Sequence, residues 1–270
     1  MTKHIVCYSG GHSSALVALH VAKTHGIDDL VLLNHDINDW VEDADIERFK
    51  NEVAQFIGLP ITYATYMDAQ FDQFDVCVKA QAFKVNNGNE LCTNRLKTGP
   101  FMEFLEANHP EKDVVIYYGF DANEIDRVTR RSSYLGALGY RTAFPLVTEK
   151  VKVTKTEQIG IRRPNGYSHF KHGNCKGCLK AGWQHWYIIY CFHPDIWAKA
   201  KWAEEEIGYA IHHDETGPVY LEDMEQKFEA MKQAGVPATE HMSHQSFWAR
   251  ANKVVKITPQ GNLFPCECVS

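Results

Sequence analysis

The chain has 270 residues, of which 44% are hydrophobic and 23% are charged, so its composition is that of a globular protein and excludes a disordered or collagen-like chain. The net charge of −6 argues against binding nucleic acid through a broadly basic surface, although a local basic groove is compatible with it. No apolar run approaches the roughly 20 residues of a membrane span. The first residues also lack the pattern of a signal peptide, which predicts a cytoplasmic protein without membrane contacts.

Strands and helices are predicted to alternate over the first part of the chain. Short apolar runs predict four buried strands, at residues 4–9, 30–35, 61–66 and 114–118. Stretches with helical spacing follow the first two runs, and they end at Gly26 and Gly58. This alternation is typical of βαβ units around a parallel sheet.

The pattern changes near residue 160. Helical spacing dominates the rest of the chain, at residues 176–191, 194–208, 221–234 and 244–256. We therefore predict two domains. The first is an α/β nucleotide-binding domain over residues 1–160, and the second is a mostly helical, cysteine-containing region over residues 161–270.

A glycine-rich loop, Ser9-Gly10-Gly11-His12-Ser13-Ser14, lies between the first predicted strand and the first predicted helix. Glycines let the backbone approach an anion closely, and a helix N-terminus adds N–H donors. The loop fits neither the Walker A pattern nor Gly-x-Gly-x-x-Gly. The pattern therefore favours a phosphate-binding loop, and the alternative is a tight turn capped by a serine.

A basic cluster follows Gly119, at the end of the fourth predicted strand. Arg127, Arg130 and Arg131 have the spacing i, i+3 and i+4, so they share one face of a helix. Glu124 lies one turn before Arg127 and can orient it. Guanidinium groups suit phosphate and sulfate oxygens, which favours an anion site over the alternative of a solvated helix face.

Eight cysteines in a chain of this length favour metal binding or catalysis over disulfides. Cys175 and Cys178 form a Cys-x-x-Cys pair, whose two-residue spacer lets both thiolates reach one ion. Cys92 and one C-terminal cysteine, Cys266 or Cys268, would complete a four-thiolate site for zinc or a [4Fe–4S] cluster. The alternatives are a redox dithiol and plain buried thiols.

The glycine-rich loop resembles the Ser-Gly-Gly-x-Asp-Ser loop of the PP-loop ATP pyrophosphatase superfamily, with Ser13 where that family has aspartate. Three later segments look like its PAPS reductase-like branch and occur in the expected order. They are Leu91-Cys92-Thr93-Asn94-Arg95-Leu96-Lys97, Gly119 to Arg127 with Glu124, and Phe144-Pro145-Leu146. The resemblance covers about residues 4–180. It implies an α/β fold with a parallel, Rossmann-like sheet of HUP type and a mostly helical C-terminal extension.

The resemblance also implies a function. The protein is expected to be an enzyme that binds ATP or an adenylyl-sulfate of the PAPS type, with Mg²⁺ assisting if ATP is cleaved to AMP and pyrophosphate. One implied reaction is adenylation-dependent sulfur transfer, with a sulfur-donor protein and a nucleic-acid acceptor as partners. The other is reduction of a sulfonucleotide through a cysteine thiolate. The alternative function is a catalytically weak nucleotide-binding or regulatory module with a structural metal site.

Roles for individual residues follow from the same resemblance. Lys97, Arg127 and Cys268 are the expected catalytic residues, the first two by neutralising the reacting oxyanion and the third as a nucleophile. The nucleotide is expected to contact Ser9, Gly10, Gly11, His12, Ser13, Ser14, Asn34, His35, Asp36, Arg95, Gly119, Glu124, Arg130 and Arg131. The expected metal ligands, for a [4Fe–4S] cluster or alternatively zinc, are Cys92, Cys175, Cys178 and Cys266. The oligomeric state is left open by the sequence.

Overall fold

The computed structural model describes residues 2–65, 67, 71–86, 88–173 and 175–255. The chain divides into two compact units, one made of residues 1–69 and 96–166 and the other of residues 70–95 and 167–270. Within the described ranges, no helix has the length and apolar character needed to cross a membrane.

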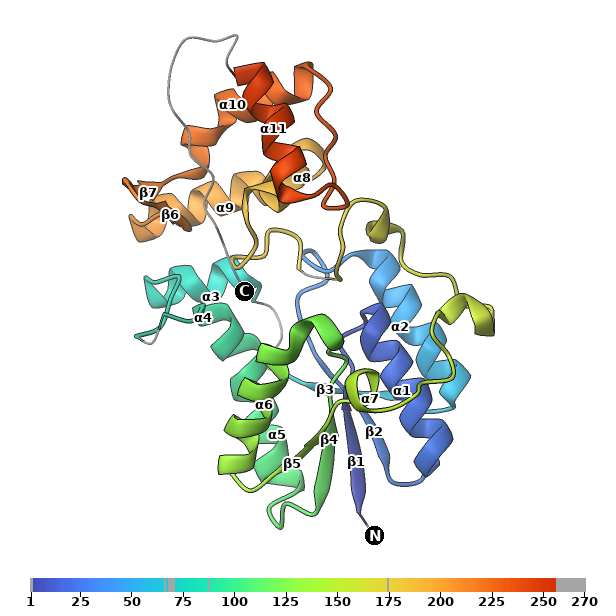
Figure 1. Cartoon of the computed structure of the whole chain (residues 1–270). Coiled ribbons are helices and arrows are strands. Elements are labelled where there is room, and N and C mark those ends of the chain that lie inside the picture. Colours follow the sequence, from blue (N-terminus) through green and yellow to red (C-terminus); the bar gives the residue numbers. More distant parts are fainter. Residues whose placement is uncertain (1, 66, 68–70, 87, 174, 256–270) are drawn as a thin grey trace. The chain divides into compact units, whose positions relative to one another are not determined.

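The first unit is built on a parallel sheet of five strands in the order β3-β2-β1-β4-β5 (Figure 1). The strands are β1 (Lys3–Cys7), β2 (Leu30–His35), β3 (Ile61–Ala64), β4 (Val114–Tyr117) and β5 (Arg141–Ala143). Val6 pairs with Leu32 on one side and with Tyr117 on the other, so β1 is the central strand. The chain moves outward from β1 to β3 and then from β4 to β5 in the opposite direction. The winding of the sheet therefore reverses between β1 and β4.

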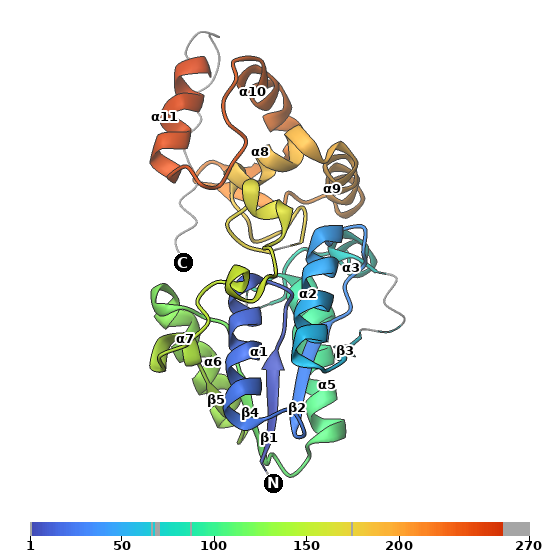
Figure 2. The same ribbon diagram turned by 90° about the vertical axis from the view of Figure 1, so that its right-hand side faces the viewer.

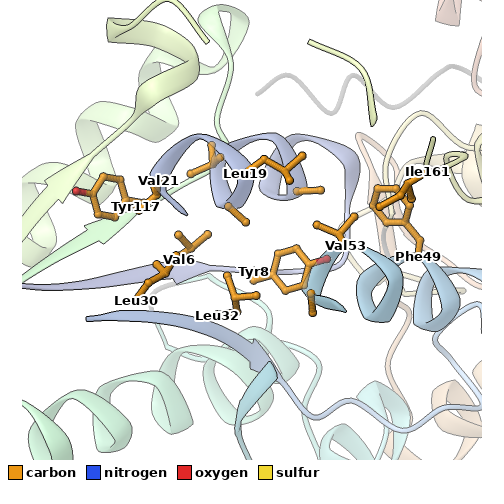
Figure 3. Packing of buried hydrophobic residues seen from close by; sticks show 14 residues of the cluster. Val6, Tyr8, Leu19, Val21, Leu30, Leu32, Phe49, Val53, Tyr117 and Ile161 are labelled. Atoms are coloured by element: carbon orange, nitrogen blue, oxygen red, sulfur yellow. The ribbon is translucent and has the colours of Figure 1, made fainter. Parts of the chain in front are cut away.

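Helices cover both faces of this sheet (Figure 2). One face is covered by α1 (His12–His25) and α2 (Ala44–Ile57), and the other by α5 (Gly99–Asn108) and α6 (Ile125–Ala137); the short α7 (Pro145–Thr148) follows β5. The core under α1 and α2 includes Val6, Tyr8, Leu19, Val21, Leu32, Phe49 and Val53 (Figure 3). The core under α5 and α6 includes Ile5, Phe101, Leu105, Ile116 and Leu135. The predicted α/β class with a parallel sheet is confirmed.

Local sequence explains how the helices of the first unit begin and end. Asp43 is the N-cap of α2, and its side chain accepts a hydrogen bond from the backbone N–H of Asp45 at 2.8 Å. Gly58 ends this helix in the left-handed conformation, with φ +85°. Gly26 likewise follows the last residue of α1 with a positive φ of +82°. Both glycines end their helices as predicted.

The second unit is mostly helical. Its helices are α3 (Gln73–Ala80), α4 (Leu91–Thr93), α8 (Trp183–Phe192), α9 (Pro194–Ile207), α10 (Leu221–Gln233) and α11 (His244–Val255). Two short strands, β6 (His212–Asp214) and β7 (Gly217–Val219), form an antiparallel hairpin. Aromatic side chains dominate the core, with Trp186, Tyr187 and Phe228 fully buried. Trp186 and Tyr187 therefore pack inside the unit and are not available to a ligand at its surface.

The division into units differs from the single boundary predicted at residue 160. Residues 70–95 belong to the second unit because α3 packs against α9 and the segment before α8. The ammonium of Lys199 contacts the carboxylates of Asp72 at 2.6 Å and Asp75 at 2.8 Å. The amide of Gln73 donates to the carbonyl of Lys176 at 2.7 Å. These partners are far apart in the sequence, so no local pattern predicts them.

Two further differences concern single elements. The helix predicted from residue 176 begins only at Trp183, because Gly177 has φ +69° and Gly182 is extended. The sequence pattern also misses β5, β6 and β7. Each of these strands has three residues, and none of them forms an apolar run. They are strands because of the neighbouring strands with which they pair, and not because of their composition.

Candidate functional site

The glycine-rich loop lies at the carboxyl end of β1, where the winding of the sheet reverses. β1 ends at Cys7, Gly11 is the N-cap of α1, and the helix begins at His12. Among the described residues, no side chain caps α1, and its first turn holds no acidic residue. Ligands of open parallel sheets bind at such a reversal, and an uncapped helix N-terminus offers N–H donors to an anion. This geometry suits the phosphate groups of a ligand.

Two glycines make room for the backbone of the loop. Gly10 has φ +75°, which favours glycine, and a Cβ there would lie 2.9 Å from Cγ2 of Ile46. A Cβ on Gly119, two residues after the end of β4, would lie 2.7 Å from the backbone nitrogen of Ser14 and 2.8 Å from the carbonyl carbon of Ser13. The loop is thus packed between the end of β4 and α2. Gly119 acts on the loop by contact, whereas its expected contact with a nucleotide stays a prediction.

Side chains of the loop hold it in this turn. The hydroxyl of Ser14 donates to the carbonyl of Gly11 at 2.8 Å, and the hydroxyl of Ser9 donates to that of Ser14 at 3.3 Å. Nε2 of His12 accepts a hydrogen bond from the backbone N–H of Thr156 at 3.4 Å. Burial lowers the pKa of His12, so its imidazole is neutral at physiological pH. His12 therefore joins the loop to a neighbouring 3₁₀ turn and adds no positive charge.

A cluster of titratable side chains lies at the same end of the sheet, on the face covered by α5 and α6. Burial raises the pKa of Cys7 to about 12 and lowers the pKa of His35 to about 4. The charges of Lys97 and Arg131 lower the pKa of His35 further. Burial also raises the pKa of Tyr118 well above its usual range. Cys7, His35 and Tyr118 are therefore neutral at physiological pH. The charge in their surroundings comes from Lys97 and Arg131 and is positive.

The three arginines of α6 have different surroundings. Arg127 pairs with Glu124 and stacks on the ring of Phe120, with its guanidinium carbon 4.4 Å from the ring centroid. Arg131 is half-buried and lies over Tyr118, 5.4 Å from its ring centroid. Arg130 is exposed, and its Nε donates to a carbonyl of its own helix at 3.3 Å. Arg127 and Arg130 are thus both exposed, whereas Arg131 is half-buried, and Arg127 and Arg131 each lie over an aromatic ring.

Two buried polar atoms at the end of β2 have no hydrogen-bond partner among the described residues. They are Nδ2 of Asn34 and Nδ1 of His35. Oδ1 of Asn34 accepts the backbone N–H of His35 at 2.6 Å, and Asp36 follows half-buried. An unsatisfied buried polar group costs about 1–3 kcal/mol. Polar groups of a bound nucleotide would recover that cost.

The predicted residues of the Cys92 segment are divided between the units. Lys97 belongs to the first unit, where its charge acts on His35. Cys92 and Arg95 belong to the second, and Arg95 is exposed. The expected joint action of Arg95 and Lys97 on one ligand therefore stays a prediction.

The structure brings the segments of three predicted metal ligands together within the second unit. Gln73 of α3 donates to the carbonyl of Lys176, between Cys175 and Cys178. Lys180 pairs with Glu90 at 3.2 Å, two residues before Cys92. No disulfide joins any of the six cysteines that the structure describes.

The described residues do not, however, form a complete metal site. No group of three or more Cys, His, Asp or Glu side chains among them is arranged to hold a metal ion. Cys266 and Cys268 lie outside the described residues, so the expected fourth ligand and the expected nucleophile stay predictions. The neighbouring segments are compatible with a thiolate site, and the metal itself stays a prediction.

Sequence reasoning missed two features at this end of the sheet. Tyr118, Phe120 and Phe144 form a near-parallel stack, with ring centroids 5.3–5.9 Å apart. Lys50 of α2 is buried and pairs with Glu42 at 2.5 Å. Lys50 follows Ile46 by four residues, so the two lie on the same buried face of the helix. A lysine at a position where the helical spacing predicts an apolar residue could have indicated a functional side chain.

Comparison with known proteins gives no family assignment. A scan against models of protein families gives no match, and a search of the curated proteins finds no significant relative.

Proposed function

We propose that the chain is a PP-loop enzyme similar to the PAPS reductase-like group, which binds ATP or an adenylyl-sulfate and carries out adenylation-dependent sulfur transfer or sulfonucleotide reduction. The observation that carries the proposal is the position of the loop from Ser9 to Ser14. It begins an uncapped helix after the central strand, and Gly119 packs against its backbone. The backbone N–H groups of such a loop suit the phosphates of the ligand.

Positive side chains would act on the anionic part of the nucleotide. Arg127 pairs with Glu124 and stacks on Phe120, and Arg131 lies over Tyr118. An arginine held in place before the ligand arrives loses less conformational entropy on binding, and it stabilises charge that develops in the transition state. Lys97 would add a third positive charge near His35. Mg²⁺ would assist if the nucleotide is ATP.

A thiolate-bound [4Fe–4S] cluster or zinc ion belongs to the same proposal. Cys92, Cys175 and Cys178 would hold it, with Cys266 as the fourth ligand. Support comes from the two contacts that join their segments, Gln73 to Lys176 and Lys180 to Glu90. A cluster would supply electrons or polarise a bound group, whereas zinc would stabilise the second unit.

One observation favours a second candidate function. Ser13 stands where the resembled loop has an aspartate, and a hydroxyl cannot supply the negative charge of a carboxylate. A loop without that charge would still bind phosphate through its backbone but would organise a reaction less well. The second candidate is therefore a nucleotide-binding or regulatory module of weak catalytic power with a structural metal site.

Release of pyrophosphate from ATP separates the two candidates. The assay uses the full chain, purified without oxygen, with Mg²⁺, with bulk nucleic acid as the acceptor whose oxygen takes up AMP, and with sulfide as a simple sulfur donor that then displaces AMP. Turnover that depends on the protein, and that is lost in Arg127→Ala, supports the enzyme. Binding of ATP without any release of pyrophosphate, together with no reduction of an adenylyl-sulfate by thiols, supports the binding module.

A further inference from the structure

A buried lysine lies beside the phosphate loop and has no role in the function proposed above. Lys50 of α2 is only 4% exposed and shares its helix face with Ile46 and Phe49. Burying an ammonium group is costly unless it is paired. The packing of α2 alone therefore does not explain why a lysine occupies this apolar face.

Contacts with the loop show where the side chain runs. A Cβ on Gly10 would lie 3.4 Å from Cδ of Lys50, so the lysine stem passes along the first glycine of the loop. The hydroxyl of Tyr8, at the end of β1, donates to the backbone carbonyl of Lys50 at 2.9 Å. The backbone of Lys50 is thus tied to the strand that leads into the loop, while its flexible side chain lies alongside.

The ammonium group is held by a carboxylate. Nζ of Lys50 lies 2.5 Å from Oε2 of Glu42, with the two side chains 5% and 15% exposed. Burial raises the pKa of Glu42, although the hydrogen bond and the charge of Lys50 act in the opposite direction. The ionised form of Glu42 thus depends on Lys50, and the nearby charges of Asp39 and Glu47 disfavour it. A second anion would compete with it readily for the same lysine.

An unsatisfied donor lies on the same face of the sheet. Asn34 is 3% exposed, its Nδ2 has no hydrogen-bond partner among the described residues, and it pairs in register with Tyr63. Neighbouring residues in register on parallel strands point to the same face. Nζ of Lys50 lies 5.5 Å from the ring centroid of that tyrosine. An amide donor and an ammonium group therefore lie on one face at the carboxyl end of the sheet, where an anion would satisfy both.

We propose that Lys50 is a phosphate-binding residue of the loop, held by Glu42 in the ligand-free protein and transferred to phosphate oxygens when a diphosphate or triphosphate binds. The loop from Ser9 to Ser14 contains no lysine or arginine of its own. Lys50 supplies that missing charge from α2. This inference rests on the proposed function, because it requires phosphate at the loop.

Competition between Glu42 and phosphate for Lys50 predicts a gain in affinity when Glu42 is removed. A purely structural ion pair would not produce such a gain. Glu42→Gln removes the competing carboxylate and releases the ammonium group for the ligand. Binding of inorganic pyrophosphate should therefore become tighter in this variant, by about threefold or more, because a buried ammonium group without its carboxylate is left uncompensated until an anion reaches it. Lys50→Met should weaken binding by about tenfold, because charge-assisted hydrogen bonds to phosphate are lost.

The test is calorimetric titration of inorganic pyrophosphate into the full chain. It compares the wild type with Glu42→Gln, Lys50→Met and the double variant, and Lys23→Met on the exposed side of α1 serves as the control. The double variant leaves no unpaired charge, so it covers the case in which Lys50→Met fails to fold. It should bind as weakly as Lys50→Met, because Glu42 acts only through Lys50.

Two results overturn the inference while leaving the loop proposal intact. One is a Glu42→Gln variant that binds pyrophosphate no more tightly than the wild type. The other is a folded variant without Lys50 that binds as tightly as the wild type. A wild-type protein that binds neither pyrophosphate nor ATP overturns the proposed function and this inference together.

Discussion

Gly119 stands two residues after the last residue of β4, where the backbone of Ser13 and Ser14 leaves no space for a side chain. We expect Gly119→Ala to displace the phosphate loop and to weaken ATP binding by at least tenfold, or about 1.4 kcal/mol. The atoms that a Cβ would meet belong to the backbone, so no rotation of a side chain can relieve the overlap. Calorimetric titration of ATP measures the effect.

Gly136→Ala is the matched control for this variant. Gly136 lies in α6 of the same unit, and a Cβ there would meet no atom within 4 Å. Alanine has the higher helix propensity, so this variant should be slightly more stable and bind ATP normally. Equal ATP affinities for the two variants would show that contact between β4 and the loop does not control the site.

Among the individual residues, the sequence predicts the loop better than its surroundings. Gly10 and Gly11 follow a strand pattern and precede a helix pattern, so their position can be read locally. Lys50 and Gly119 act on the loop from separate elements, and only the fold brings them close to it. Their roles depend on distances that the spacing of residues along the chain does not encode.

Helix α9 illustrates how one residue joins several elements. Both oxygens of Glu204 accept backbone hydrogen bonds at 2.8 Å, one from Ile211 before β6 and one from Leu221 at the start of α10. Burial raises the pKa of Glu204 to about 7, although these donors favour its charged form. Glu204 therefore couples the packing of the second unit to pH.

The sign of this coupling follows from the raised pKa. An unfolded glutamate has a pKa of about 4.3, so the folded protein binds this proton more tightly than the unfolded chain. The contribution of Glu204 to the free energy of unfolding is thus fully present below the unfolded pKa and is lost as pH rises through about 7. We expect Glu204→Gln to remove this part of the pH dependence. It also loses one acceptor, so the slope with pH and not the absolute stability is the readout.

Urea unfolding between about pH 5 and about pH 8 measures this slope for the wild type and the variant. Glu229→Gln is a suitable control, because Glu229 lies on α10 and hydrogen bonds from Gln233 and Tyr190 lower its pKa, so it stays ionised over this pH range. If Glu204→Gln has the same slope as the wild type, Glu204 does not titrate in the way that its burial indicates.

Secondary-structure elements that contain an apolar run can be predicted from the sequence, whereas short polar elements cannot. β1, β2 and β4 are buried, and their apolar residues are visible in the sequence. β5 contains Arg141, Thr142 and Ala143, and it becomes a strand because it pairs with β4 at the edge of the sheet. α3 is helical locally, but its place in the second unit depends on its contacts with Lys199 and Lys176.

The molecule as a whole combines a sheet unit that carries the phosphate loop with a helical unit that carries the cysteine segments. We expect anaerobically purified protein to contain a metal or an iron–sulfur cluster, and Cys175→Ser to lose most of it. Thermal stability should fall with it, because a structural metal site contributes directly to folding. Metal analysis measures the metal content, and absorbance at about 400 nm, where a [4Fe–4S] cluster absorbs, distinguishes a cluster from zinc.

Cys191→Ser is the control for this experiment. Cys191 lies in α8, and burial raises its pKa, which disfavours the thiolate that a metal requires. It should leave both metal content and stability close to those of the wild type. Metal-free wild-type protein, or equal metal loss in the two variants, would remove the thiolate site from the proposal.

The central claim is that the loop between β1 and α1 binds the phosphates of an adenine nucleotide. Calorimetric titration of ATP and of adenosine, with Mg²⁺ present, into the wild type and Gly10→Val tests it most directly. We expect the wild type to bind ATP at one site and much more tightly than adenosine. Gly10→Val should lose this preference, because a side chain at φ +75° would press against Ile46 and distort the loop. A wild type that binds ATP no more tightly than adenosine, or a Gly10→Val variant that keeps the full preference, would contradict the claim.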